Sequence, residues 1–155
     1  MIYFAYGSNL DPRQWAERCP RSEPVAVAWL PGHRLAFPRR SPIRNCAVAS
    51  IVPADGDGVW GMLYRMDAAD FAALDRREGW FPDRPAESRY RRQAISVAQA
   101  GGERVEAVTY VAVPSPDPGL PSATYLRHII DGARHHRFPE AYVTMLETLP
   151  AMAAA

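Results

Sequence analysis

MIYFAYGSNL, residues 1–10, begins as an apolar strand and ends in a polar turn. The first five residues are predicted to form a buried strand, which the sequence YGSN at 6–9 breaks. Asp11 and Pro12 then match the N-cap and the first position of a helix, and Gln14 stands where a capping box needs it. A turn that points at a helix N-terminus presents several backbone N–H groups to one point, which suits a carboxylate or a phosphate. An ordinary strand-to-helix connection is the alternative that this pattern leaves open.

Length and composition favour one domain, residues 1–150, with a short tail at 151–155. The chain has 155 residues, 48% of them hydrophobic, which is enough for one core. A formal net charge of +1 gives no reason to expect nucleic acid or a membrane as a partner. All 18 basic residues are arginine, so no lysine is available as a Schiff base or general base. Cys19 and Cys46, without a signal peptide, indicate a reduced, cytoplasmic compartment and neither a disulfide framework nor a metal cluster.

Six or seven strands and three or four helices are predicted from the apolar stretches and the turn signals between them. The strands are expected at 1–5, 25–30, 33–37, 46–52, 59–66, 90–98 and 104–113. The helices are expected at 12–19, at 68–77 after the cap Asp67, after the cap Ser122, and from Phe138 and Pro139 onward.

Three further signals describe the connections between these elements. The sequence DGDG at 55–58 is a strong hairpin signal, Pro31 and Gly32 predict another turn, and 38–45 predicts a basic loop. Because strands and helices do not alternate regularly, a doubly wound sheet is disfavoured. The expected fold is α+β, one small domain with a mixed, barrel-like sheet and flanking helices.

A carboxylate occupies the apolar face of the helix expected at 68–77. Phe71, Leu74 and Glu78 are spaced i, i+3 and i+7, so Glu78 shares a face with two side chains that must be buried. Glu78 also stands at the helix C-terminus, before the C-cap Gly79, where the macrodipole disfavours an anion. Burial and the dipole both raise its pKa, as a general acid–base residue requires. Pairing with a nearby arginine at a frayed helix end is the alternative.

The remaining polar residues carry weaker signals. Asp70 and Asp75 are interpreted as cap and surface residues. The four histidines lack the spacing of a zinc site, and His135 and His136 are ascribed to an exposed helix end. Ser8 is interpreted as a hydrogen-bonding turn residue, because it lies outside a G-x-S-x-G motif.

Three stretches of the chain contain distinctive motifs, namely YFAYGSNL at 3–10; VWG at 59–61 with MD at 66–67 and LDRREG at 74–79; and PSATY at 121–125. In these motifs the sequence resembles the gamma-glutamylcyclotransferase (AIG2-like) family over most of its length, from residue 2 to about residue 149. The resemblance implies a small mixed domain built around a barrel-like sheet. It also implies that Glu78 is the catalytic general acid–base residue. The substrate-binding residues that it implies are Tyr3, Phe4, Ala5, Tyr6, Gly7, Ser8, Asn9 and Tyr125.

The activity implied by the resemblance is the conversion of a γ-glutamyl amino acid or amide to 5-oxoproline and a free amine. The substrate's own α-amine attacks its γ-carbonyl, so neither a protein nucleophile nor a cofactor is needed. A γ-glutamylamine cyclotransferase, a biosynthetic γ-glutamyl-deprotecting enzyme and a non-catalytic γ-glutamyl-binding module are the alternatives. The sequence departs from the family pattern at 80–89, a longer stretch than usual before Tyr90, which affects the outer pocket wall and the choice of leaving group.

Overall fold

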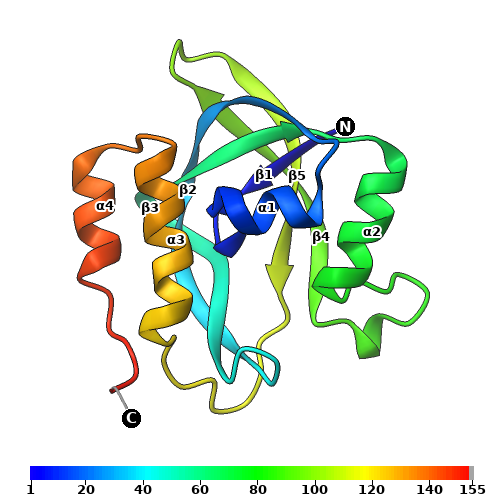
Figure 1. The fold of residues 1–155 in the computed structure, drawn as a ribbon, viewed down its shortest axis with the longest axis vertical. Helices are drawn as coiled ribbons and strands as arrows, with labels where there is room; N and C mark the ends of the chain where they lie inside the picture. The colour runs from blue at the N-terminus through cyan, green and yellow to red at the C-terminus, as the bar shows by residue number, and fades with distance from the viewer. Residues whose placement is uncertain (154–155) are drawn as a thin grey trace.

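The computed structural model describes residues 1–153, in which five strands close into a barrel (Figure 1). The strands are β1 (Ile2–Ala5), β2 (Glu23–Ser41), β3 (Cys46–Arg65), β4 (Tyr90–Gln99) and β5 (Arg104–Ala112). Around the barrel they follow the order β1-β3-β2-β4-β5. All neighbours are antiparallel except β1 and β5, which are parallel where Tyr3 meets Val108. The α+β fold with a mixed, barrel-like sheet is thus confirmed.

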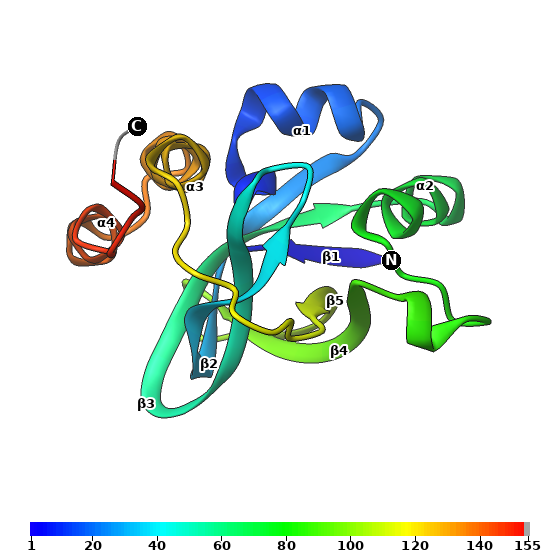
Figure 2. The same ribbon diagram turned by 90° about the horizontal axis from the view of Figure 1, so that it is seen from below.

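Helices surround this barrel rather than alternate with its strands. They are α1 (Pro12–Arg18), α2 (Ala68–Glu78), α3 (Ala123–His135) and α4 (Glu140–Glu147), with short 3₁₀ turns η1 (Ser8–Leu10) and η2 (Pro85–Glu87). Figures 1 and 2 show α2 and α3 on opposite sides of the barrel, with α1 between them. None of the helices within residues 1–153 has the length and apolar character that crossing a bilayer requires.

Two predicted turns are wrong, because they lie inside long strands that pair with each other. β3 continues through residues 55–58, where the sequence predicts a hairpin, and β2 continues through Pro31 and Gly32. Pro31 is opposite Gly58 and His33 is opposite Pro53, so Gly32 alone faces residues 54–57. The glycine-rich signals therefore mark a bulge in one two-stranded ribbon. The seven expected strands become five.

The true hairpin between β2 and β3 is the four-residue turn 42–45, which ends with Asn45 at a φ of 54°. The basic loop predicted at 38–45 is therefore shorter, and Arg39 and Arg40 belong to β2. This turn carries Arg44 to the end of β1, where its guanidinium contacts Ser8.

The helix caps were predictable from local sequence, and the structure confirms them. Asp11, Asp67 and Ser122 each accept a backbone N–H from the first turn of the helix that follows, at 3.0, 2.7 and 3.0 Å. Gly79 ends α2 with a φ of 78°, a left-handed conformation that glycine adopts without strain. Because Gly79 ends α2 at this point, Glu78 is its last helical residue.

Helix α3 packs against η1 at a point where no side chain fits. A Cβ at Gly132 would overlap the backbone of Leu10. His128, from the same helix, contacts Asp11 at 2.7 Å and adds a polar contact beside this close approach. Helix α3 therefore fixes the position of the chain that follows β1.

The chain after α4 is held in part against the domain. Ala151 packs against the core, and the N–H of Met152 donates to the carbonyl of Pro121 at 2.9 Å. Of the tail expected at 151–155, residues 154–155 lie outside the described residues.

Candidate active site

The turn of residues 7–9, hereafter the 7–9 turn, lies where β1 leaves the barrel. Tyr6 anchors the approach to it, because its side chain is buried and its hydroxyl donates to the backbone carbonyl of Tyr110. Within residues 1–153, the backbone N–H groups of Gly7, Ser8 and Asn9 donate to no other protein group. The turn therefore offers three free N–H donors, the feature that the sequence predicts for binding a carboxylate.

Asn9 is the centre of the hydrogen-bond network around this turn. Its side-chain amide donates to the Tyr3 hydroxyl at 3.0 Å and to Glu78 Oε1 at 3.1 Å. Its Oδ1 accepts from Arg18 at 2.6 Å and from Gln14 at 3.2 Å. All four bonding positions of the amide are thus used, which fixes the orientation of Asn9.

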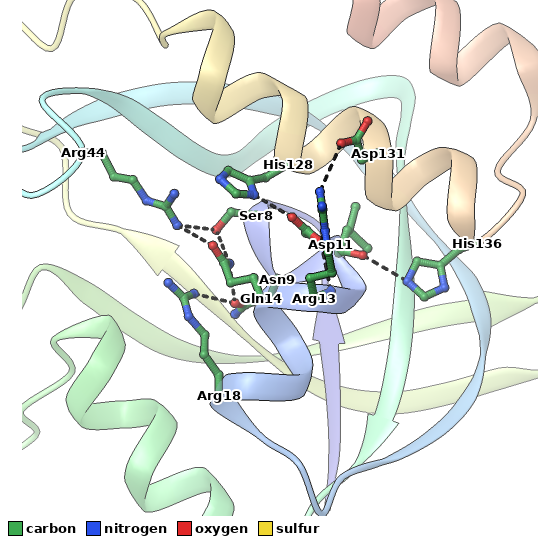
Figure 3. A network of polar contacts seen from close by, with 11 residues as sticks. Ser8, Asn9, Asp11, Arg13, Gln14, Arg18, Arg44, His128, Asp131 and His136 are labelled. Carbon is green, nitrogen blue, oxygen red and sulfur yellow. Dashed lines mark hydrogen bonds and ion pairs between the residues drawn. The ribbon is translucent and has the colours of Figure 1, made fainter.

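Gln14 does not complete the capping box that its spacing predicts. Its amide instead donates to Ser8 Oγ at 3.0 Å, and its Oε1 accepts from Arg44 at 2.8 Å (Figure 3). Arg44 Nη2 also donates to Ser8 Oγ at 3.3 Å. Ser8 is therefore a hydrogen-bonding turn residue, as expected. Because Gln14 faces the 7–9 turn, its side chain bonds to Ser8 and Arg44 instead of completing the cap at Asp11.

Glu78, the last residue of α2, contacts the 7–9 turn through its hydrogen bond with Asn9. Phe71 and Leu74, on the same face of the helix, are each 1% exposed, as the helical spacing predicts. Within residues 1–153, the bond from Asn9 is the only hydrogen bond to the Glu78 side chain, so its second carboxylate oxygen is free. Burial raises the pKa of Glu78, against the opposing effects of Arg18, the Asn9 bond, Arg44 and Arg77.

The alternative in which Glu78 pairs with an arginine finds no support within residues 1–153, where no ion pair to it occurs. Arg92, one possible partner, instead holds Asp75 through two hydrogen bonds of 2.9 and 2.6 Å. Asp75 also accepts the Tyr110 hydroxyl at 2.6 Å. The interpretation of Asp75 and Asp70 as cap and surface residues is wrong, because Asp75 ties α2 to β4 and β5.

Asp70 is likewise buried, at 7% exposure, and accepts a hydrogen bond from Arg21 at 3.1 Å. Of the two histidines ascribed to an exposed helix end, His135 is exposed. His136 is partly buried and contacts the carbonyl of Leu10 at 3.2 Å, so the exposed-end interpretation is wrong for it. Asp70 therefore ties Arg21 to α2, and His136 contacts Leu10, the residue that follows the 7–9 turn.

Tyr125 stands in the first turn of α3, where the cap Ser122 fixes the start of the helix. Its hydroxyl accepts the backbone N–H of Ala49 at 2.9 Å, and Tyr90 donates to the carbonyl of the same residue at 2.8 Å. Burial raises the pKa of Tyr125 to about 12, so its hydroxyl stays protonated at neutral pH. Since its lone pair binds Ala49, its own proton is available to a ligand.

These side chains line one cavity beside the 7–9 turn. Its lining is formed by Tyr3, Tyr6, Gly7, Ser8, Asn9, Ala49, Glu78, Tyr90, Tyr110 and Tyr125. Seven of the nine predicted site residues are among them. Phe4 and Ala5 are not, since both are fully buried in the barrel core. Sequence reasoning missed Ala49 and Tyr110, which come from β3 and β5 and lie in no recognisable motif.

No group of three or more His, Cys, Asp or Glu side chains in residues 1–153 is arranged to hold a metal ion. Cys19 and Cys46 are buried free thiols, and burial raises the pKa of Cys19 to about 11. A thiol with a raised pKa is a poor nucleophile at neutral pH. A carboxyl with a raised pKa beside free N–H donors is an arrangement that can support proton transfer.

Comparison with known proteins agrees with this geometry. A model of the AIG2-like family matches residues 58–146, more than half of the chain. The chain belongs to the AIG2-like family. Family membership expected from the motifs is thus confirmed, and the matched range contains α2 with Glu78 and α3 with Tyr125.

Two curated relatives of this AIG2-like protein are the gamma-glutamylcyclotransferases of Mus musculus and Homo sapiens. Each is 28% identical over 152 residues, which cover 96% of this chain and 78% of the relative. A solved structure named gamma-glutamyl cyclotransferase superposes with a TM-score of 0.91 at 26% identity, covering 100% of this chain and 90% of the other. The match extends over the barrel and its helices together.

Proposed function

We propose that this AIG2-like protein is a γ-glutamyl cyclotransferase that converts γ-glutamyl amides to 5-oxoproline and a free amine. The observation that carries the proposal is the position of Glu78, which has a raised pKa and one free oxygen and faces the 7–9 turn across a single cavity. Relatives named gamma-glutamylcyclotransferase, at 28% identity, support the same reaction.

In this proposal the 7–9 turn binds the γ-glutamyl unit. The free N–H groups of Gly7, Ser8 and Asn9 donate to its α-carboxylate or to the oxygen of its γ-carbonyl. The Tyr125 hydroxyl supplies a further donor from the other wall of the cavity. Phe4 and Ala5 support the turn from the core without lining the cavity.

Glu78 then carries one proton through the reaction. Its carboxylate takes a proton from the substrate's α-ammonium, and the freed amine attacks the γ-carbonyl carbon to form a five-membered ring. The tetrahedral carbon collapses as Glu78 returns the proton to the leaving nitrogen, the amide C–N bond breaks, and the amine departs. The ring nitrogen loses its second proton to the departing amine, which leaves as an ammonium ion. Atoms balance without a cofactor, because the nucleophile and the leaving group belong to one substrate.

Positioning supplies the second contribution to the rate. A γ-glutamyl chain in solution is mostly extended, with its amine far from its γ-carbonyl. A cavity that holds both ends of the unit keeps the amine near the carbonyl, and aligned intramolecular reactions reach effective molarities of about 10⁵ M or more.

Product analysis tests the proposed function. Incubation with γ-glutamyl-alanine should release 5-oxoproline and alanine in equal amounts, with no free glutamate, as read by chromatography or NMR. Release of glutamate would mean that water attacks the carbonyl, which contradicts cyclisation. Calorimetric binding without any product would instead support a γ-glutamyl-binding module.

A further inference from the structure

A second, larger pocket continues outward from the cavity. The two share Ser8, Glu78, Tyr90 and Tyr125 in their linings, so they meet at the proposed general acid–base residue. When the γ-glutamyl end of a substrate fills the inner cavity, its amide bond lies beside Glu78. Its leaving group then lies in this outer pocket.

Arginine dominates the wall of the outer pocket. Five arginines line it, from α1, β2, the 42–45 turn, α2 and the segment before β4: Arg18, Arg39, Arg44, Arg77 and Arg89. Within residues 1–153, none of the five forms an ion pair with a carboxylate. The arginines that do form such pairs lie elsewhere and are Arg13, Arg21, Arg65, Arg84, Arg92 and Arg134.

Neutral acceptors hold three of the five guanidinium groups in place. Arg18 donates to Asn9 at 2.6 Å and Arg44 to Gln14 at 2.8 Å, and Figure 3 shows both side chains directed at the residues around the 7–9 turn. Arg39 donates to the carbonyl of Val113 at 3.0 Å. A guanidinium has five N–H donors, so each group keeps donors for a ligand. Three of the five guanidinium groups are thus fixed in position without an ion pair.

Electrostatics in the pocket favour an anion. Glu78 is the only carboxylate in the lining, against five guanidinium groups. Burial lowers the pKa of Arg18, Glu78 opposes that effect, and the nearby charges of Arg44 and Arg77 lower it further. A bound carboxylate would relieve this repulsion through charge-assisted hydrogen bonds, which guanidinium groups form in bidentate geometry.

We infer that the outer pocket selects γ-glutamyl amides whose leaving amine is itself an acidic amino acid, carrying two carboxylates. This inference rests on the proposed function, because cyclotransfer defines which end of the substrate leaves. A single arginine suffices for the one carboxylate of a neutral amino acid. Five arginines around one pocket match a leaving group with more negative charge, and the exposed Ile43 and the buried Val48 at its wall accommodate a short aliphatic stem.

Two dipeptides of the same size test the inference, γ-glutamyl-glutamate and γ-glutamyl-glutamine, which differ by one charge in the leaving group. We expect kcat/KM at low salt to favour γ-glutamyl-glutamate by at least about tenfold, or about 1.4 kcal/mol. In about 1 M salt, where the Debye length is about 3 Å, the ratio should fall. Equal rates for the two dipeptides, or faster turnover of the glutamine form, would overturn the inference.

Arginine variants test which side chains cause the preference for γ-glutamyl-glutamate. The double variant Arg77→Gln/Arg89→Gln should bring the ratio of the two rates close to one. Both side chains lack a hydrogen bond to other described residues. Arg104→Gln, at the exposed start of β5, is the matched control and should keep the wild-type ratio. A double variant that retains the full preference would contradict the assignment to these arginines.

Binding separates this inference from the proposed function. Calorimetry with the same dipeptides on Glu78→Gln measures their dissociation constants without turnover. If the wild-type protein forms no 5-oxoproline, the proposed function fails, but tighter binding of γ-glutamyl-glutamate still supports the arginine pocket. Equal dissociation constants, or no binding of either dipeptide, would overturn the inference whatever the rates are.

Discussion

We expect Glu78→Gln to lower kcat/KM for γ-glutamyl-alanine by about 10³-fold, within the range of about 10²–10⁴ that general acid–base residues contribute. Glutamine keeps the size of the side chain and can bond to Asn9, but it cannot take a proton from the α-ammonium. Glu17→Gln, an exposed residue of α1, is the matched control and should keep the wild-type rate. Release of 5-oxoproline by Glu78→Gln at near wild-type rate would remove Glu78 from the mechanism.

The same variant should be at least as stable as the wild-type protein at neutral pH. Burial raises the pKa of Glu78 above the ordinary 4.5, so the folded state binds the proton more tightly than the unfolded state does. The contribution of this carboxyl to stability is therefore present at low pH and is lost as the pH rises through the folded-state pKa. Glutamine carries no charge and avoids that loss.

Melting temperatures at several pH values measure this effect. Glu78→Gln should melt higher than wild type at pH 7, and the difference should narrow as the pH falls towards 4.5, the ordinary value for glutamate. A variant that melts several degrees lower at neutral pH would show that the carboxylate has a structural role. Any loss of activity would then have two explanations.

The second large effect is expected at Gly132, where α3 meets η1. A glycine-to-alanine change in an exposed helix normally stabilises it by up to about 1 kcal/mol. At Gly132 the sign should reverse, because the new methyl group overlaps the backbone of Leu10. Overpacking of this kind costs about 1–3 kcal/mol, or roughly 2–12 °C in melting temperature for a chain of this size.

Gly101→Ala is the control for this change, since nothing lies within 4 Å of a Cβ at that position. It should melt within a degree or two of wild type. Gly132→Ala should also lose activity, because pushing α3 outward separates Tyr125 from the 7–9 turn. An unchanged melting temperature for Gly132→Ala, read by circular dichroism, would contradict the close packing of α3 on η1.

The parts of the fold set by neighbouring residues could be predicted from the sequence. The caps at Asp11, Asp67 and Ser122, and the buried face of α2, depend on residues within a turn or two of each other. The apparent hairpin at 55–58 could not be interpreted correctly, because the same glycines serve a turn or a bulge. The choice depends on β2, whose residues paired beside the bulge lie at least 20 positions away.

The candidate site also has residues that could be predicted from the local sequence and residues that could not. The 7–9 turn could be predicted because a polar turn directly follows a buried strand. Glu78 could be predicted because an acidic residue lies on the apolar face of a helix. Tyr110 and Asp75 could not, because each looks ordinary until β5 and α2 meet. The arginines of the outer pocket come from five separate segments, so only the folded chain brings their charges together.

A substrate with a blocked amine tests the central claim most directly. If the α-amine is the nucleophile, γ-glutamyl-alanine yields 5-oxoproline and alanine, while N-acetyl-γ-glutamyl-alanine yields neither product. The acetyl group leaves the γ-amide intact, so a hydrolase that uses water would cleave both compounds. Alanine released from the acetylated dipeptide at a rate comparable with that from γ-glutamyl-alanine would contradict the account.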